Sequence, residues 1–160
     1  MNRLYERSSN RCAADALDAG LRAEITAHAD AHQLGDVLGD ARFCCETRSV
    51  RLKRPGLLSR ITGSGDVDTE HRMIAVVTSR YLVIAIVGEK RGTHVRSIRL
   101  DAVSVGNSEL LAGLDSGVSA TGLWSGAHEA ASFYIGLGED AEGNAFLDAL
   151  RGAIAEAKSA

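Results

Sequence analysis

Two apolar runs separated by three polar residues constrain the fold of this chain more than any other feature. Residues 73–77 read Met-Ile-Ala-Val-Val and residues 81–87 read Tyr-Leu-Val-Ile-Ala-Ile-Val, with Thr-Ser-Arg between them. Short runs rich in β-branched residues on either side of a polar break are typical of a β-hairpin. The interrupted run is also shorter than the roughly 20 apolar residues that a membrane-spanning helix needs. The sequence therefore predicts a hairpin that is buried on at least one face of a sheet.

Further strand-like segments surround this hairpin, and short polar connections join them. They are residues 42–52, 94–100, 117–124 and 131–137, and residues 57–61 could add a short further piece. Strands joined by short connections pair mostly antiparallel. From about Asp140 the apolar residues Phe146, Leu147, Leu150 and Ile154 share one face of a predicted helix. The expected fold is α+β: a strongly bent antiparallel sheet or partly open barrel of six to seven strands, capped by a C-terminal helix.

The first part of the chain has helical rather than strand-like spacing. Residues 1–9 are polar and are predicted to fray. Residues 10–34 are predicted to form an amphipathic helix, with Ser9 or Asn10 as its N-cap and Gly35 at its end. We therefore divide the chain into an N-terminal helical extension, residues 1–39, and a domain, residues 40–160. The helix either packs on the domain or offers the stripe Leu17, Leu21 and Ile25 to a partner protein.

Composition indicates a single globular domain and sets few limits on its partners. The 160 residues are 45% apolar and 24% charged, and the formal net charge is −3. Three cysteines, of which Cys44 and Cys45 are neighbours, do not make a disulfide framework, and neighbours on a strand point to opposite faces. Reduced thiols and the lack of an apolar signal segment in residues 1–11 predict a soluble, cytoplasmic protein.

Four patterns in residues 42–158 follow one another in a fixed order. The first is the hairpin, and the second is the strand end Ile-Arg-Leu-Asp-Ala-Val-Ser-Val at residues 98–105. The third is the late pair of strands, and the fourth is the helix that carries Phe146, Leu147 and Leu150. In this order they resemble a bacterial pleckstrin-homology-like (PH-like) domain, in which the last helix plugs one end of the barrel. The tryptophan common in that helix of eukaryotic members is absent, with Phe146 nearest to it, which favours the bacterial branch.

The resemblance implies a scaffold rather than one activity, because PH-like folds carry lipid binders, peptide binders and modules of other roles. Members that bind phosphoinositides use basic residues on and around their first two strands. The matching residues here are Arg48, Arg51, Lys53, Arg54 and Arg60. Such a cluster can bind phosphate headgroups or an anionic membrane surface. Alternatively, these cations form a solvated strand face that protects a sheet edge from aggregation.

Other candidate sites are weaker. His28 and His32 are one helical turn apart, with Asp36 one turn further, and could hold two positions of a metal site, but the Glu of an H-E-x-x-H site is missing and no Cys is near in sequence. Trp124, Phe133 and Tyr134 could line a pocket for a small ligand. No nucleotide-binding or hydrolase motif occurs, so we expect neither an enzyme nor a cofactor. The basic segment lacks interleaved aromatics, so we expect no nucleic-acid partner.

These observations favour a non-catalytic PH-like interaction module that binds a protein partner or self-associates. Leu17, Leu21 and Ile25 are its predicted partner-binding residues. The alternative function is binding to anionic phospholipid through the basic segment, residues 48–60. Purified protein that sediments with anionic but not neutral liposomes would support that alternative.

Overall fold

The computed structural model describes residues 4–52, 68–107 and 115–160. Within them, five strands form an antiparallel sheet in the order β1-β2-β3-β4-β5, and three form a second sheet in the order β6-β7-β8. The elements are β1 (Tyr5–Arg11), α1 (Ala19–Ala31), β2 (Phe43–Arg51), β3 (Glu70–Val77), β4 (Tyr81–Gly88), β5 (Gly92–Arg99), β6 (Ser104–Gly106), β7 (Gly117–Gly122), β8 (Ala131–Gly136) and α3 (Ala141–Ser159). Two short 3-10 turns, Ala14–Ala16 and Leu100–Ala102, precede α1 and β6.

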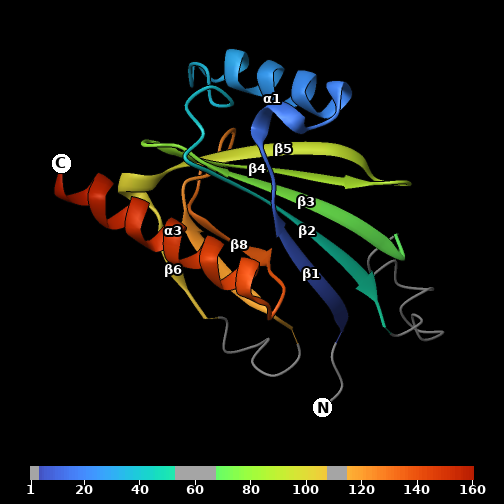
Figure 1. The fold of residues 1–160 in the computed structure, drawn as a ribbon. Coiled ribbons are helices and arrows are strands. Elements are labelled where there is room, and N and C mark those ends of the chain that lie inside the picture. Colours follow the sequence, from blue (N-terminus) through green and yellow to red (C-terminus); the bar gives the residue numbers. More distant parts are fainter. Residues whose placement is uncertain (1–3, 53–67, 108–114) are drawn as a thin grey trace.

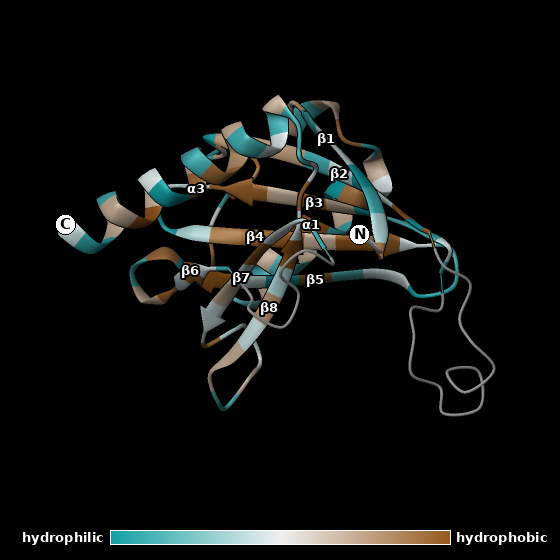
Figure 2. Cartoon of the chain, turned by 90° about the horizontal axis from the view of Figure 1, so that it is seen from below, coloured by the Kyte–Doolittle hydropathy of each residue, from teal (hydrophilic) through white to brown (hydrophobic). Residues whose placement is uncertain are grey.

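The large sheet is covered on both faces, which explains why its middle strands are apolar throughout. Helix α1 lies on one face, and α3 with the small sheet lies on the other (Figure 1). Along β3, Ile74 and Val76 pack with α1, whereas Ala75 and Val77 pack in the core beneath α3. Alternate residues of a strand point to opposite faces, so a strand between two layers needs apolar residues at every position. Figure 2 shows this apolar colouring along β3 and β4.

The predicted hairpin and C-terminal helix are confirmed. In the hairpin, β3 pairs antiparallel with β4, and Ala75 lies opposite Ile84. The Thr78 hydroxyl closes the turn by accepting a hydrogen bond from the Tyr81 N–H at 2.9 Å. Asp140 caps α3 by accepting from the Gly143 N–H at 2.8 Å, and Phe146 faces the core with no exposed surface.

The predicted N-terminal organisation is wrong in its first half. Residues expected to fray form β1, which pairs antiparallel with β2 over its whole length, from Tyr5 opposite Arg51 to Arg11 opposite Cys45. The helix begins only after Asp18, whose carboxylate accepts from the Leu21 N–H at 2.9 Å. An N-cap Asp has an extended backbone and accepts a hydrogen bond from the first turn, so the helix begins directly after it. Strand β1 was missed because its residues are polar and its partner lies far along the chain.

The architecture is α+β with two antiparallel sheets and a C-terminal helix, but the sheet does not close into a barrel. The described residues hold eight strands rather than six or seven, because β1 adds an edge strand to the large sheet. The further strand expected at residues 57–61 lies outside the described residues. In the described part of the chain, no helix is long and apolar enough to cross a membrane.

Candidate functional site

Of the five predicted basic residues, the structure describes Arg48 and Arg51, and these two do not lie together. Arg48 is exposed and makes a two-bond ion pair with Glu70, which raises the pKa of Arg48 and lowers that of Glu70. Arg51 is three residues further along β2, so strand alternation directs it to the opposite face. Lys53, Arg54 and Arg60 lie outside the described residues. The described part of this segment therefore supplies no convergent group of cations.

The stripe predicted to contact a partner is buried instead. Leu17, Leu21 and Ile25 are 9%, 4% and 0% exposed, and they pack with Cys44, Ile74, Val76, Val83 and Ala85 of the large sheet. Of the two alternatives left by the sequence, the structure shows the helix packed on the sheet. The prediction that these three side chains present a partner surface is wrong for this conformation, because the sheet already covers them.

Two of the three aromatic residues expected around a pocket do meet at one. The Trp124 and Phe133 rings lie 5.4 Å apart in an edge-to-face arrangement, and both line a hollow of about 640 Å³. Tyr134 is the next residue on β8 and points to the other face, where the Arg7 guanidinium lies 5.7 Å from its ring. The prediction is therefore right for Trp124 and Phe133 and wrong for Tyr134.

This hollow is a groove with two walls, and we call it the β5 groove. One wall is α1, through Glu24, Ala27 and His28. The other is formed by the β7–β8 connection and the start of β8, residues 124–127 and 131–133. Arg96 reaches from β5 across the second wall, and its guanidinium carbon lies 4.3 Å from the Phe133 ring centre. The groove thus combines an aromatic wall, a cation and an acidic residue on the facing helix.

The floor of the groove is an open strand edge, residues 93–96 of β5. The sheet ends at β5, because β6 belongs to the second sheet. Ser97 uses its outward backbone groups: its N–H donates to the Ser125 hydroxyl at 3.0 Å, and its carbonyl accepts from the Ser125 N–H at 2.9 Å. Backbone groups of an edge strand face outward at every second residue, so those of Val95 and Thr93 also face outward. Among the described residues, they make no hydrogen bond.

A histidine and a serine hold the helical wall against β5. His28 Nε2 lies 2.9 Å from the Ser97 hydroxyl, and the His28 and His32 rings are 4.4 Å apart. Burial and the neighbouring His32 lower the pKa of His28, which keeps it neutral near pH 7. The Ser97 side chain is buried, so its hydroxyl contacts α1 and does not face the groove. The described residues contain no group of three His, Cys, Asp or Glu that could hold a metal.

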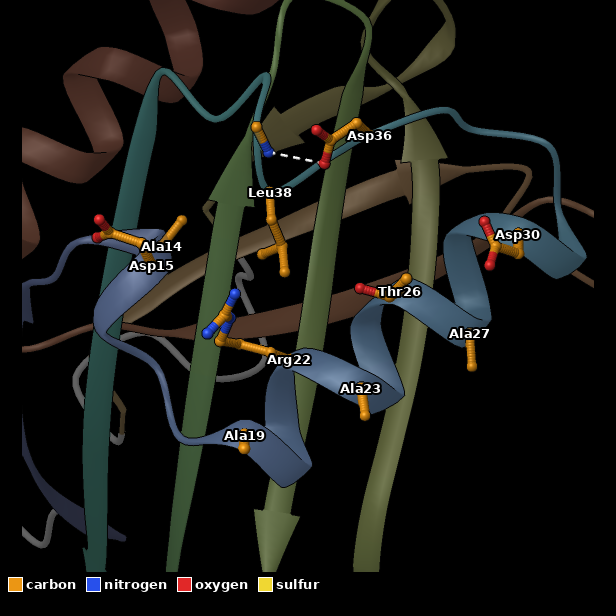
Figure 3. A pocket seen from close by; sticks show the side chains of 11 residues that line it. Ala14, Asp15, Ala19, Arg22, Ala23, Thr26, Ala27, Asp30, Asp36 and Leu38 are labelled. Atoms are coloured by element: carbon orange, nitrogen blue, oxygen red, sulfur yellow. Dashed lines mark hydrogen bonds between the residues drawn. The ribbon is translucent and has the colours of Figure 1, made fainter.

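A slightly larger hollow, of about 720 Å³, lies on the outer side of α1. Figure 3 shows its lining: Ala19, Ala23 and Ala27 along the helix, and Leu38 from the following loop. The Asp36 carboxylate is held by the Gly39 N–H at 2.9 Å rather than being directed at a ligand. Small side chains and solvated acids offer few specific contacts, so we regard the β5 groove as the better site.

The sequence did not predict the open strand edge that forms the floor of the β5 groove. Nothing in residues 93–96 distinguishes an edge strand from an inner one except its higher polarity, with Thr93, His94 and Arg96. Edge position depends on where the sheet ends, which is a property of the whole topology. No family model, curated protein or solved structure matches this chain.

Proposed function

We propose that the chain is a non-catalytic interaction module that binds an extended segment of a partner protein along β5. The single observation that carries the proposal is the open strand edge at the bottom of a two-walled groove. An extended peptide can add to such an edge as a further strand, with main-chain hydrogen bonds giving affinity and alternate side chains entering the walls.

The outward backbone groups of Thr93 and Val95 offer two donors and two acceptors. Since a strand rises about 3.4 Å per residue, a segment of roughly five residues covers this edge. Its alternate side chains face different walls. We expect an apolar side chain against Phe133, which is only partly buried beside the buried Trp124, and a basic or neutral one beside Glu24.

The resemblance to PH-like domains agrees with this role but adds no ligand, and membership of that family stays part of the proposal. In its support, an antiparallel sheet is followed by a second sheet and a C-terminal helix that packs in the core. Lipid binding is the less favoured function, because the described cations of the basic segment do not converge.

The test exploits proline at an outward-facing position. Val95→Pro removes an outward N–H without removing a ladder bond to β4, since proline is tolerated on an edge strand when its nitrogen faces away from the sheet. Val95→Ala shortens the side chain but keeps the N–H, so it is the matched control. Both variants should keep the far-UV circular dichroism spectrum of the parent.

The probe is a random octapeptide library displayed on phage and selected against the full chain. Selected peptides are then synthesised and titrated while the fluorescence of Trp124, the only tryptophan in the sequence, is recorded. We expect Val95→Pro to weaken binding at least about tenfold, through a lost hydrogen bond and a steric clash, and Val95→Ala less than about threefold. Peptides that bind Val95→Pro as well as the parent would overturn the proposal.

Hydrogen exchange gives a second, independent measurement. In the protein alone, the amides of Thr93 and Val95 should exchange faster than those of His94 and Arg96, which face β4. A selected peptide should slow the first pair specifically. If a second copy of this chain were the occupant, the same slowing would appear with rising protein concentration and no peptide.

A further inference from the structure

A pair of cysteines on neighbouring strands lies outside the β5 groove. Cys12 directly follows β1 and Cys44 lies on β2. The Arg11–Cys45 pair of the ladder places Cys12 and Cys44 directly opposite one another at its next position. The Cys12 N–H donates to the Cys44 carbonyl at 2.9 Å, and the two sulfur atoms are 3.0 Å apart. Residues opposite one another on neighbouring strands have their side chains on the same face, and this brings the two sulfur atoms together.

The two thiols differ in access and in acidity. Cys12 is half-buried and Cys44 is buried, and both line a hollow of about 640 Å³ that also contains Arg11 and Arg42. The hydrogen bond from Cys44 lowers the pKa of Cys12, whereas the same bond and burial raise the pKa of Cys44. Thiolates are the reactive form of cysteine, so the accessible member of the pair is also the more nucleophilic one.

We propose that Cys12 and Cys44 form a hydroperoxide-sensitive site that closes into a reversible disulfide. Cys12 attacks one oxygen of hydrogen peroxide, and the O–O bond breaks to leave a sulfenic acid on Cys12 and hydroxide. The Cys44 sulfur then attacks the Cys12 sulfur, its proton goes to the departing hydroxyl, and water leaves. The two sulfurs lose two electrons to the peroxide, and the hydroxide takes a proton from solvent.

The disulfide would tie the start of β2 to the chain that leads into α1. It closes a loop of about 30 residues that contains the whole of α1. Cross-linking a loop of this length destabilises the unfolded state, so the oxidised protein should melt roughly 5–15 °C higher than the reduced one. A thiol reductant should reverse this shift.

The third cysteine is the matched control. Cys45 is adjacent to Cys44 but packs in the core on the opposite side of the sheet, and burial raises its pKa to about 11. Trypsin releases Cys12 in one peptide and both Cys44 and Cys45 in another, residues 43–48. Cys45→Ser therefore assigns the bridge without ambiguity.

The experiment treats the reduced full chain with hydrogen peroxide, blocks remaining thiols and measures intact and peptide masses. We expect the parent and Cys45→Ser to lose two hydrogen atoms and to yield the peptide pair joined through Cys12 and Cys44. Cys12→Ser, at the less buried position, should fold and form no bridge. The proposal is overturned if the parent only gains oxygen atoms, if it does not react, or if a bridge persists in Cys12→Ser.

Discussion

Arg7 is buried although it stands on an edge strand. Its guanidinium Nη2 lies 2.9 Å from Asp115 Oδ2, and the two side chains are only 6% and 5% exposed. The guanidinium also lies 4.8 Å from the Tyr5 ring centre. Close approach is possible because residue 136 of β8 is glycine, where a Cβ would clash with the guanidinium. The pair joins β1 to the residues that directly precede β7.

Removing one partner of this pair should destabilise the protein strongly. Arg7→Met leaves the Asp115 carboxylate buried without its cation, which we expect to cost about 3–5 kcal/mol in the free energy of unfolding by urea. The control is Arg99→Met, since Arg99 and Asp101 form an exposed pair, 70% and 40% accessible. An exposed pair contributes little to stability, because solvent screens its charges. Equal losses in the two variants would contradict the assignment.

The same variant should respond to pH in a defined direction. Burial already raises the pKa of Asp115, against the opposing effects of Arg7 and the Ser116 N–H. Without Arg7 the folded-state pKa rises further above the unfolded value. The folded protein then binds more protons than the unfolded chain, so stability increases as pH falls through the folded-state pKa. The deficit of Arg7→Met relative to the parent should therefore shrink between pH 7 and pH 5.

No pattern in the sequence predicted that these two charged residues pair and are buried. Arg7 lies in a polar stretch predicted to fray, and its partner is 108 residues away. Burial of a charge depends on which segments cover it, and that is fixed only once β1 has joined the sheet. In contrast, the apolar positions of β3 and β4 were predictable because their burial follows from local composition.

At the scale of whole elements, the two long helices begin in the same way but with different connections. Asp18 caps α1 through one bond, to the Leu21 N–H. Asp140 caps α3 and also accepts from the Ser9 N–H of β1 at 2.9 Å. One carboxylate thus starts the last helix and holds the first strand, and the Gly138 N–H completes the junction by donating to the Ser9 hydroxyl.

This difference predicts unequal costs for the same substitution. Asp18→Ala should lower the free energy of unfolding by about 1 kcal/mol, the usual loss for an N-cap. Asp140→Ala should lower it by about 2–3 kcal/mol, because the buried Ser9 N–H also loses its partner. Denaturant unfolding of both variants measures the difference. If the two losses were equal, the bond to β1 would contribute nothing.

Elements were predictable where local pattern and final burial agree. Residues 140–158 repeat apolar side chains at helical spacing, and α3 forms there. In residues 10–18 the spacing suggested the same helix, but pairing with β2 and the Asp18 cap take precedence. The β5 groove was predictable only in part. Trp124 and Phe133 were identifiable as large apolar residues, whereas the open edge beneath them follows from the order of strands in the sheet.

At the scale of the molecule, two cores share the middle strands of one sheet. Ile25 belongs to the core under α1, and Phe146 belongs to the core under α3. Strands β2, β3 and β4 contribute side chains to both. The described N-terminal residues, 4–39, therefore share a sheet and a core with the domain that follows them.

This sharing predicts a single unfolding transition. Ile25→Ala and Phe146→Ala should each destabilise the whole protein, by about 2–5 and 3–5 kcal/mol. Far-UV circular dichroism and Trp124 fluorescence should report coincident midpoints in both variants. Leu52→Ala, at a residue that is 51% exposed, is the control and should shift neither midpoint. A circular-dichroism change that precedes the fluorescence change in Ile25→Ala would show that the N-terminal part unfolds separately.

The junction at Ser9 also sets an order of events during synthesis. Ser9 and Gly138 are 129 residues apart, and a ribosome adds about 5–20 residues per second. On the order of ten seconds therefore passes between the emergence of the two residues. During that interval β1 can pair with β2, but its contacts with the last helix do not yet exist. The nascent chain is consequently open at this edge until Gly138 and the start of α3 have emerged.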